Sequence, residues 1–378
     1  MKKKKSLWET IRRPTLLVDE ETVRSNIARM AGLARRSGVI FRPHFKTHQS
    51  AVIGNWYRDY GVSAITVSSV TMARYFARHG WQDITVAFPV NLRETEEINT
   101  LAGEIQLNIL VEHPETAKAL TGRLKYETGV FIEIDTGYRR TGVHWDDTDP
   151  LEEIMEILHK APQLRFRGFL SHTGDTYAAA SAKEIKELYR TAVERMNYLK
   201  KKYLPAFPGL LLSLGDTPSF SLLDSVTDID EMRPGNFVFY DLMQMFLGSC
   251  TWENIAVAMA CPVVALYPER KETVIYGGAV HFSKDYLIRN GRKIYGMAVR
   301  LTPYGLQLFD PPVYLTGLSQ EHGIISMDTA QMKAFRRRDL ITVLPVHSCL
   351  TANLMSGYLT TSGKKADHLN GNRESTAS

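Results

Sequence analysis

Residues 39–48 read VIFRPHFKTH, and they place Lys46 where a short apolar strand ends. The β-branched and aromatic residues at 39–41 are typical of a buried strand. An amine at the end of such a strand can hold a carbonyl cofactor as a Schiff base, although most lysines at strand ends are only solvated. The rest of the chain decides between these two interpretations of Lys46.

Short apolar runs alternate with helical patterns over the first two-thirds of the 378-residue chain. The predicted strands are 16–19, 39–45, 64–68, 84–88, 107–111, 130–135, 166–171, 210–214 and 229–233. The predicted helices are 22–36, 70–78, 94–101, 114–120, 151–159 and 182–201. This alternation predicts an α/β fold with a parallel sheet, and it supplies one strand more than a closed eight-stranded (β/α) TIM-type barrel needs.

The pattern changes after about residue 245, where β-type runs follow one another without clear helices. These runs are 255–260, 262–267, 272–276 and 340–346. We therefore expect a mostly β C-terminal domain. Residues 363–378 are polar and aperiodic, which predicts a disordered tail.

Composition argues against several classes of protein. The net charge of +5 includes the lysines at 2–5, and no basic stripe interleaved with aromatic residues follows, so we expect no nucleic-acid partner. No apolar run reaches the roughly 18 residues of a membrane span, and the start lacks the apolar stretch of a signal peptide. Three widely spaced cysteines argue against a disulfide scaffold. These features predict a soluble, cytoplasmic protein without a membrane partner.

Polar residues follow most of the predicted strands, and in a parallel barrel the strand ends meet at one mouth. They are His44, Lys46, Ser68, Ser69, Asp135, Arg139, Arg140, His172, Asp175, Ser213, Asp216, Thr217, Arg233 and Asn236. Each of them singly has a structural explanation, such as a turn or a helix cap. Together they favour one ligand site at the mouth.

Two glycine-containing loops are suited to bind a phosphate group. Backbone N–H groups near Gly215 and Gly235, with the Thr217 hydroxyl, could hold the anion, and Tyr240 could add a phenolic hydrogen bond. The chain has neither Gly-x-x-x-x-Gly-Lys-Ser/Thr nor a Gly-x-Gly-x-x-Gly after the first strands. A phosphate-bearing cofactor is therefore favoured over a nucleotide.

Six motifs follow one another between about residues 12 and 360. They are RPHFKTH at 42–48, DTGYRRTGV at 135–143, SHTGDTY at 171–177, SLGDTPS at 213–219, MRPGNFVFYDLMQ at 232–244 and LPVHSCLTANL at 344–354. This set resembles the metal-dependent D-serine dehydratases, which belong with D-threonine aldolases and, more distantly, alanine racemases among the fold type III pyridoxal phosphate (PLP) enzymes. The resemblance implies a PLP-binding barrel over 21–245 and a β domain over 1–20 and 246–362, which recruits the ninth strand.

The resemblance also implies roles for individual residues. Lys46 matches the Schiff-base lysine, Arg140 the arginine near the phenolic oxygen of the cofactor, and His172 the histidine that packs on its ring. Arg233 stands where racemases place an arginine against the pyridine nitrogen. The full set of predicted cofactor-binding residues is Lys46, His44, Arg140, His172, Tyr177, Thr217, Arg233, Gly235, Asn236 and Tyr240.

The prediction of a metal site depends on His347 and Cys349. Residues i and i+2 of a strand share a face, so a strand at 340–346 that continued to 349 would present the imidazole and the thiolate side by side. Nitrogen and sulfur donors favour zinc over magnesium or calcium, although His-x-Cys alone is more often structural. The family resemblance favours zinc, because D-serine dehydratases have this pair whereas D-threonine aldolases have His-x-Asp.

These assignments imply a PLP- and zinc-dependent lyase that eliminates water from a D-3-hydroxy amino acid. D-Serine is the expected substrate and gives pyruvate and ammonia, with Lys46 taking the α-proton and zinc stabilising the departing hydroxide. An aldolase acting on D-threonine, or an aldolase or dehydratase acting on 3-hydroxy-D-aspartate, stays open, because the sequence does not place the group that faces the β-oxygen and so decides which bond breaks. Gln49 stands where relatives usually have a second lysine, which leaves D-threonine and 3-hydroxy-D-aspartate open as substrates. A non-catalytic PLP-binding protein would need neither the metal pair nor the β domain. The resemblance further implies a homodimer.

Overall fold

The computed structural model describes residues 7–302 and 305–371, and the chain divides into two compact units. The barrel unit comprises residues 27–46 and 54–237, and the β unit comprises 1–26, 47–53 and 238–378. The expected boundaries, at 20/21 and 245/246, lie a few residues away from this division. Residues 47–53, directly after Lys46, were not expected to group with the β unit.

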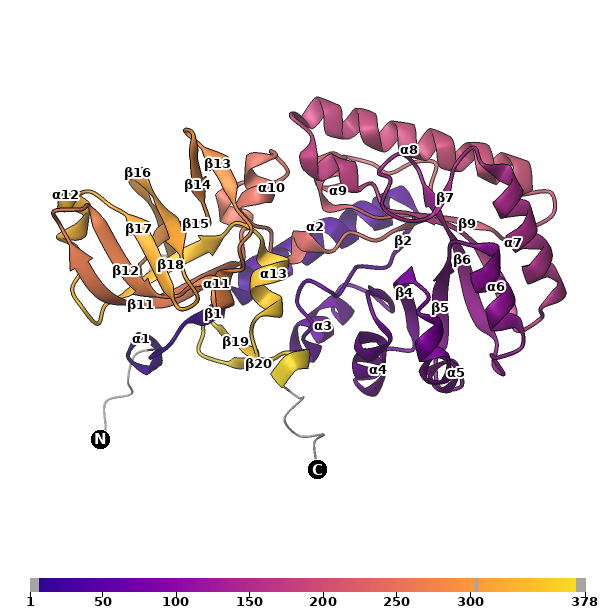
Figure 1. The fold of residues 1–378 in the computed structure, drawn as a ribbon, viewed down its shortest axis with the longest axis horizontal. Coiled ribbons are helices and arrows are strands. Elements are labelled where there is room, and N and C mark those ends of the chain that lie inside the picture. The colour runs from indigo at the N-terminus through magenta and orange to yellow at the C-terminus, as the bar shows by residue number, and fades with distance from the viewer. Residues whose placement is uncertain (1–6, 303–304, 372–378) are drawn as a thin grey trace. The chain divides into compact units, whose positions relative to one another are not determined.

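Eight parallel strands form the barrel unit, in the order β2-β10-β9-β8-β6-β5-β4-β3 (Figure 1). They are β2 (Ile40–Phe41), β3 (Ala64–Val67), β4 (Asp83–Pro89), β5 (Gln106–Val111), β6 (Thr128–Asp135), β8 (Leu164–Ser171), β9 (Leu211–Leu214) and β10 (Glu231–Met232). A parallel bridge between His44 and Thr66 joins the two ends of this order. The Phe45 N–H donates to Thr66 O at 2.8 Å, and the Thr66 N–H donates to Pro43 O at 2.9 Å. The predicted eight-stranded barrel is confirmed.

Helices connect these strands, as the alternating pattern predicted. They are α2 (Glu20–Ser37), α3 (Ala51–Arg58), α4 (Val70–Arg78), α5 (Thr95–Ala102), α6 (Pro114–Thr121), α7 (Thr148–Lys160), α8 (Ala182–Tyr203) and α9 (Thr217–Leu222). Short 3-10 helices are η1 (Leu92–Glu94), η2 (Gly174–Ala178) and η3 (Asn236–Val238), and a two-residue strand β7 (Val143–His144) pairs with β6. Helix α8 begins after Ser181, whose hydroxyl accepts from the Glu184 N–H, and its last turn contains three lysines. The sequence patterns missed α3 and α9.

A layer of apolar side chains fills part of the barrel unit. One residue from each of five neighbouring strands contributes to it: Ala87, Leu110, Phe131, Leu170 and Leu211. Gly168 on β8 has φ +141, and a Cβ at this position would lie 2.0 Å from Leu211 O. Glycine therefore permits the close contact between β8 and β9.

The β unit contains a nine-stranded sheet in the order β12-β17-β16-β15-β18-β11-β1-β19-β20. Its strands are β1 (Thr15–Val18), β11 (Val257–Tyr267), β12 (Glu272–Tyr276), β15 (Gly296–Thr302), β16 (Gly305–Leu318), β17 (His322–Ser326), β18 (Leu340–Pro345), β19 (Gly357–Thr360) and β20 (Lys365–Asp367). A separate hairpin pairs β13 (Leu287–Arg289) with β14 (Arg292–Ile294). The helices are α1 (Leu7–Thr10), α10 (Leu242–Phe246), η4 (Trp252–Asn254), α11 (Ala279–Phe282), α12 (Thr329–Met332) and α13 (Ser348–Asn353).

The ninth predicted strand, at 16–19, is β1, which pairs antiparallel with β11 and parallel with β19. The disorder expected from residue 363 onward is wrong for residues 363–371, since β20 pairs with β19 there. The Asp367 carboxylate also accepts hydrogen bonds from Ser50 Oγ at 2.8 Å and from the Val52 N–H at 3.0 Å. Residues 372–378 lie outside the described part of the chain. None of the helices within the described ranges is both long and apolar enough to cross a membrane.

Candidate active site

The placement of Lys46 follows from its neighbour Phe45, which is fully buried. The Phe45 ring packs against Tyr57, Phe76 and Trp81, with centroid distances of 4.8, 5.0 and 5.1 Å. Phe45 and Lys46 lie in the turn that directly follows the bridge closing the barrel, and there Phe45 is buried whereas Lys46 is exposed. The Lys46 N–H donates to His44 Nδ1 at 3.3 Å.

Five of the predicted cofactor-binding residues form one electrostatic group in the barrel unit. Burial holds the pKa of His44 well below its usual value, and the charges of Lys46 and Arg233 lower it further. Burial, followed by the charges of Lys46 and Arg140, lowers the pKa of His172 to about 3. Both rings are therefore neutral near pH 7, and the positive charge of the group comes from the lysine and the two arginines. Such a group suits an anionic ligand.

The polar loops after β8, β9 and β10 contact one another around His172. Its Nδ1–H donates to Gly215 O, which fixes the tautomer because a carbonyl oxygen can only accept. The Tyr177 ring lies 6.1 Å from the His172 ring, and the Tyr177 hydroxyl accepts from the Thr217 N–H at 3.2 Å. Thr217 Oγ1 in turn accepts from the Phe237 N–H at 3.3 Å.

Asp216 holds the beginning of α9, where the phosphate-binding Thr217 was predicted. Its Oδ1 accepts from the Ser219 N–H at 2.6 Å, and its Oδ2 accepts from the Thr173 hydroxyl. Burial raises the pKa of Asp216 to about 6, although these hydrogen bonds oppose the shift.

The second predicted phosphate loop follows β10. Pro234 O accepts from the His44 N–H at 2.9 Å, so the backbone before Gly235 and Asn236 contacts the segment that carries Lys46. Asn236 is buried and begins η3. Tyr240 belongs to the β unit and has φ +48, a left-handed conformation. Its predicted hydrogen bond to the cofactor stays a prediction.

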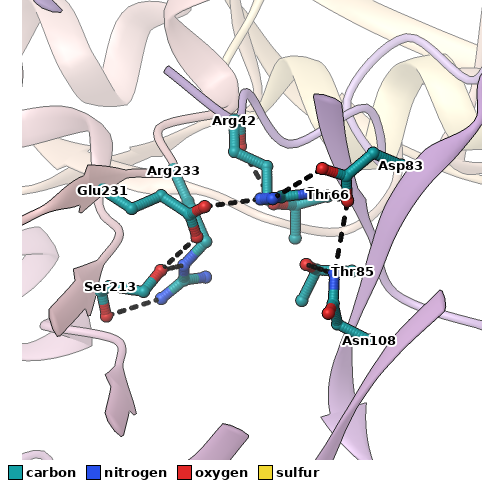
Figure 2. Close-up of polar contacts among 8 residues, drawn as sticks. All are labelled: Arg42, Thr66, Asp83, Thr85, Asn108, Ser213, Glu231 and Arg233. Atoms are coloured by element: carbon teal, nitrogen blue, oxygen red, sulfur yellow. Dashed lines mark hydrogen bonds and ion pairs between the residues drawn. The ribbon is translucent and has the colours of Figure 1, made fainter. Parts of the chain in front are cut away.

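A buried ion pair lies among the barrel strands, and the sequence patterns had not singled it out (Figure 2). Arg42 Nε donates to Glu231 Oε2 at 2.6 Å, and Arg42 Nη1 donates to Asp83 Oδ1 at 2.6 Å. Burial alone would lower the pKa of Arg42, but the two carboxylates raise it above the usual value. Asn108 Nδ2 extends the network, with bonds to Asp83 Oδ1 at 3.3 Å and to Thr85 Oγ1 at 3.2 Å.

Arg233 belongs to the same network and lies beside Ser213 and the Glu231 carboxylate (Figure 2). Its Nε donates to Ser213 Oγ at 2.6 Å, and Ser213 Oγ donates to Glu231 Oε1 at 2.6 Å. Its Nη2 donates to Ser171 O at 2.7 Å. Burial lowers the pKa of Arg233 to about 10, while Glu231 acts in the opposite direction. Arg233 is therefore charged at neutral pH.

Glu133 on β6 is a further buried carboxylate that the sequence patterns missed. Its Oε1 accepts from Thr141 Oγ1 at 2.8 Å, and its Oε2 has no hydrogen-bond partner within the described residues. Burial raises the pKa of Glu133, and the charges of Arg140 and Arg233 lower it. This residue therefore belongs to the same electrostatic group as the two arginines.

The expected strand through His347 and Cys349 is wrong. Strand β18 ends at Pro345, and His347 instead precedes helix α13. Asp241 Oδ2 accepts from the Ser348 N–H at 2.9 Å and from its hydroxyl at 3.1 Å, so the chain turns into a helix at this point.

His347 and Cys349 nevertheless interact within the β unit. Burial opposes protonation of His347, but hydrogen bonds with Asp285 and Cys349 outweigh it and raise the pKa to about 11. His347 Nδ1 lies 2.7 Å from Asp285 Oδ2. Cys349 Sγ lies 3.3 Å from Oγ1 of Thr47, the residue that follows Lys46 in the chain.

Both implied groups can be compared with the donors that the chain offers. A lysine amine, two arginines and neutral histidines fit PLP, which is a carbonyl compound with an anionic phosphate. Across residues 7–302 and 305–371, no group of three or more His, Cys, Asp or Glu side chains is placed to hold a metal. Imidazole and thiolate are the donor types that zinc prefers, and an Asp on the second ring nitrogen is its usual outer partner. The pair fits a zinc site that leaves positions for other ligands.

Two family profiles match the chain. The "Alanine racemase, N-terminal domain" matches residues 18–242, and the "Putative serine dehydratase domain" matches residues 256–361. D-serine dehydratase of Dictyostelium discoideum is 29% identical, over 91% of this chain and 92% of that protein. D-threo-3-hydroxyaspartate dehydratase of Delftia sp. (strain HT23) is 28% identical, over 92% of this chain and 94% of that protein. Relatives named 3-hydroxy-D-aspartate aldolase and D-threonine aldolase also match, at 27% and 25% identity.

The solved structure of the Delftia dehydratase superposes with a TM-score of 0.87 and 26% identity, over 97% of this chain and 99% of that one. Two further structures of that enzyme are a histidine-to-alanine variant and a cysteine-to-alanine variant "in the metal-free form", at positions two residues apart. The fold and both profiles agree with the resemblance that the six motifs carry. The chain belongs to the family of the alanine racemase N-terminal domain, among the fold type III PLP enzymes, and its β unit carries the serine dehydratase domain.

Proposed function

We propose that this protein is a PLP- and zinc-dependent lyase that eliminates water from a D-3-hydroxy amino acid, with D-serine as the substrate. The observation that carries the proposal is the combination of the cationic group around Lys46 with the His347–Cys349 pair. The first suits the cofactor and the second suits a Lewis acid. A non-catalytic PLP carrier would need only the first.

PLP, when bound, supplies an electron sink that acidifies the Cα–H bond of an attached amino acid. The exposed amine of Lys46 would hold the cofactor and then accept the α-proton. Arg140 and Arg233 would bind its negatively charged oxygens or its ring. His172, neutral and held by Gly215 O, would pack beside the ring without adding charge.

Zinc would supply the Lewis acid that stabilises a departing hydroxide, which is a poor leaving group. His347 and Cys349 would hold the ion. Asp285 occupies His347 Nδ1, which leaves Nε2 as the ligand nitrogen. Thr47, the residue after Lys46, contacts the sulfur of Cys349, one of the two proposed zinc ligands.

A second function has support from the comparisons. The relative with the TM-score of 0.87 is named for D-threo-3-hydroxyaspartate, whose reaction is also a dehydration. Aldolases among the relatives require the same cofactor anchor but break the Cα–Cβ bond. The presence of Cys349 favours dehydration, since the aldolases were expected to carry His-x-Asp.

Product analysis tests the proposal. The purified protein, loaded with PLP and zinc, is incubated with D-serine, D-threonine, D-threo-3-hydroxyaspartate and their L forms, and keto acid is separated from glycine plus aldehyde. We expect pyruvate and ammonia from D-serine, loss of turnover on chelation, and recovery with zinc. Glycine as the main product would contradict dehydration. Faster turnover of the hydroxyaspartate would reassign the substrate.

We also propose that the protein is a homodimer, on the basis of the family resemblance, and that it is cytoplasmic, on the basis of its three widely spaced cysteines. No disulfide joins the cysteines within the described residues, which suits a reducing compartment. Light scattering during size-exclusion chromatography would show a mass of about twice 42.8 kDa for the dimer. A single-chain mass at micromolar concentration would contradict it.

A further inference from the structure

Glu231 is fully buried and has no place in the proposed chemistry, yet it joins two arginines (Figure 2). Its Oε2 accepts from Arg42 Nε at 2.6 Å, and its Oε1 accepts from Ser213 Oγ at 2.6 Å. Ser213 Oγ accepts from Arg233 Nε, also at 2.6 Å. The direction of this chain of bonds is fixed: an arginine can only donate, so the single Ser213 proton goes to Glu231.

We propose that Glu231 and Ser213 are positioning residues for Arg233, with Glu231 acting through the Ser213 hydroxyl. The inference rests on the proposed function, because it assigns Arg233 to the bound PLP. The guanidinium is held on two sides, by Ser213 at Nε and by Ser171 O at Nη2. Nη1 makes no hydrogen bond within the described residues, so it is the nitrogen left for the ligand.

A purely structural role for Glu231 would be to neutralise Arg42. Arg42 has a second carboxylate partner, however, since Asp83 accepts from Nη1 at 2.6 Å and from Nη2 at 3.1 Å. The hydrogen bond from Ser213 to Glu231 Oε1 adds nothing to the pairing with Arg42. It does orient the Ser213 hydroxyl, which accepts the hydrogen bond from Arg233 Nε. The two roles of Glu231 therefore make different predictions for Ser213. The pairing of Glu231 with Arg42 does not depend on the Ser213 hydroxyl, whereas the position of Arg233 does.

The test compares two buried hydroxyls of the same barrel. Ser213→Ala removes the hydroxyl between Glu231 and Arg233. The control Thr85→Val removes a hydroxyl that accepts a hydrogen bond from Asn108 Nδ2. The full-length protein of each variant is freed of cofactor and titrated with PLP, and the visible band of the lysine-bound cofactor is then followed from pH 6 to 9. We expect Ser213→Ala to weaken PLP binding about tenfold and to shift the band or its pH midpoint. Thr85→Val should match the unmodified protein.

Coupling to Arg233 decides whether Ser213 acts through it. In an Arg233→Lys background the Nε donor is gone, so Ser213→Ala should cause no further change in the band or in PLP affinity. Equal effects of Ser213→Ala in both backgrounds would overturn the proposal. So would a Ser213→Ala spectrum identical to that of Thr85→Val. If Ser213→Ala does not fold, Ser213→Gly, which removes the same hydroxyl, serves in the same cycle with the same expectations.

Failure of the proposed function has a different result. If the unmodified protein binds no PLP, the proposed function fails and this inference fails with it. If it binds PLP normally and only the coupling is absent, the proposed function stands and the positioning role is wrong.

Discussion

His44 pairs with Thr66 in the parallel bridge that closes the barrel, two residues before Lys46. The same stretch of backbone therefore closes the barrel and positions the proposed cofactor anchor. Phe45, between the two residues, is held by three aromatic rings. This arrangement accounts for the fixed backbone under an otherwise exposed lysine.

Lys46→Ala should abolish the visible band of the lysine-bound cofactor and lower turnover of the D-amino acid by roughly 10³-fold or more. Absorption spectroscopy and ammonia release measure the two effects. Lys118→Ala, at an exposed lysine on α6, is the matched control and should keep both signals. A band that persists in Lys46→Ala would refute the anchor.

Asp285→Asn should weaken zinc binding about 10- to 100-fold, because the amide orients His347 less strongly than the carboxylate does. Cys349→Ala should weaken it further, since a ligand atom is lost. Competition with a chromophoric chelator measures the affinity without reference to turnover. Glu269→Gln, an exposed acid of the β unit, should leave it unchanged. Equal affinities for all four proteins would rule out this metal site.

Asp216→Asn should alter the dependence of stability on pH. Burial raises the pKa of Asp216 from 3.8 to about 6, so the native state binds more protons than the unfolded state between these values. Asp216 therefore contributes most to the free energy of unfolding below pH 3.8, and this contribution is lost as the pH rises through 6. The loss amounts to at most about 3 kcal/mol.

Urea unfolding at pH 4.5 and pH 7 measures this contribution. The stability of the unmodified protein relative to Asp216→Asn should be lower at pH 7 than at pH 4.5. The exposed Asp224→Asn is the control and should show no such difference. The opposite sign for Asp216→Asn would show that its hydrogen bonds outweigh its burial.

Gly168→Ala should destabilise the barrel by more than about 3 kcal/mol. A Cβ at this position would lie 2.0 Å from Leu211 O, and the φ of +141 is unfavourable for alanine. Gly209→Ala is a matched control, because a Cβ there meets nothing within 4 Å. Thermal unfolding of the two variants should separate them clearly, and similar midpoints would contradict the contact between β8 and β9.

The His172 ring should stay neutral from pH 5 to 9, since burial lowers its pKa to about 3. The ¹⁵N chemical shifts of a histidine-labelled sample should show Nδ1 protonated and Nε2 unprotonated throughout this range. A His172 signal that titrates near pH 6.5 would contradict the buried, neutral ring.

The barrel could be predicted from sequence because each of its strands has a local signal. Apolar runs and helical stripes alternate, and β3, β5 and β6 lie within two residues of their predicted bounds. The β unit was less predictable, because pairs such as β15 with β18 join segments far apart in the chain. Locally, its strands look like any short apolar run.

The site residues divide in the same way. Lys46, His172 and Thr217 each follow a predicted strand. Because the ends of parallel barrel strands meet at one mouth, the sequence predicted that these residues lie near one another. Asp285 lies 62 residues from His347, and nothing in the sequence connects the two. The helix at Ser348 depends on Asp241, 107 residues away, which is why the local pattern predicted a strand.

The pairing of β2 with β10 has a consequence for biosynthesis. Arg42 and Glu231 are separated by 189 positions, and the barrel stays open until the second of them has been made. The lysine emerges early from the ribosome, whereas the closed barrel that positions it cannot form until more than half of the chain has been translated. A nascent chain can therefore complete the proposed cofactor site only late in its synthesis or after release.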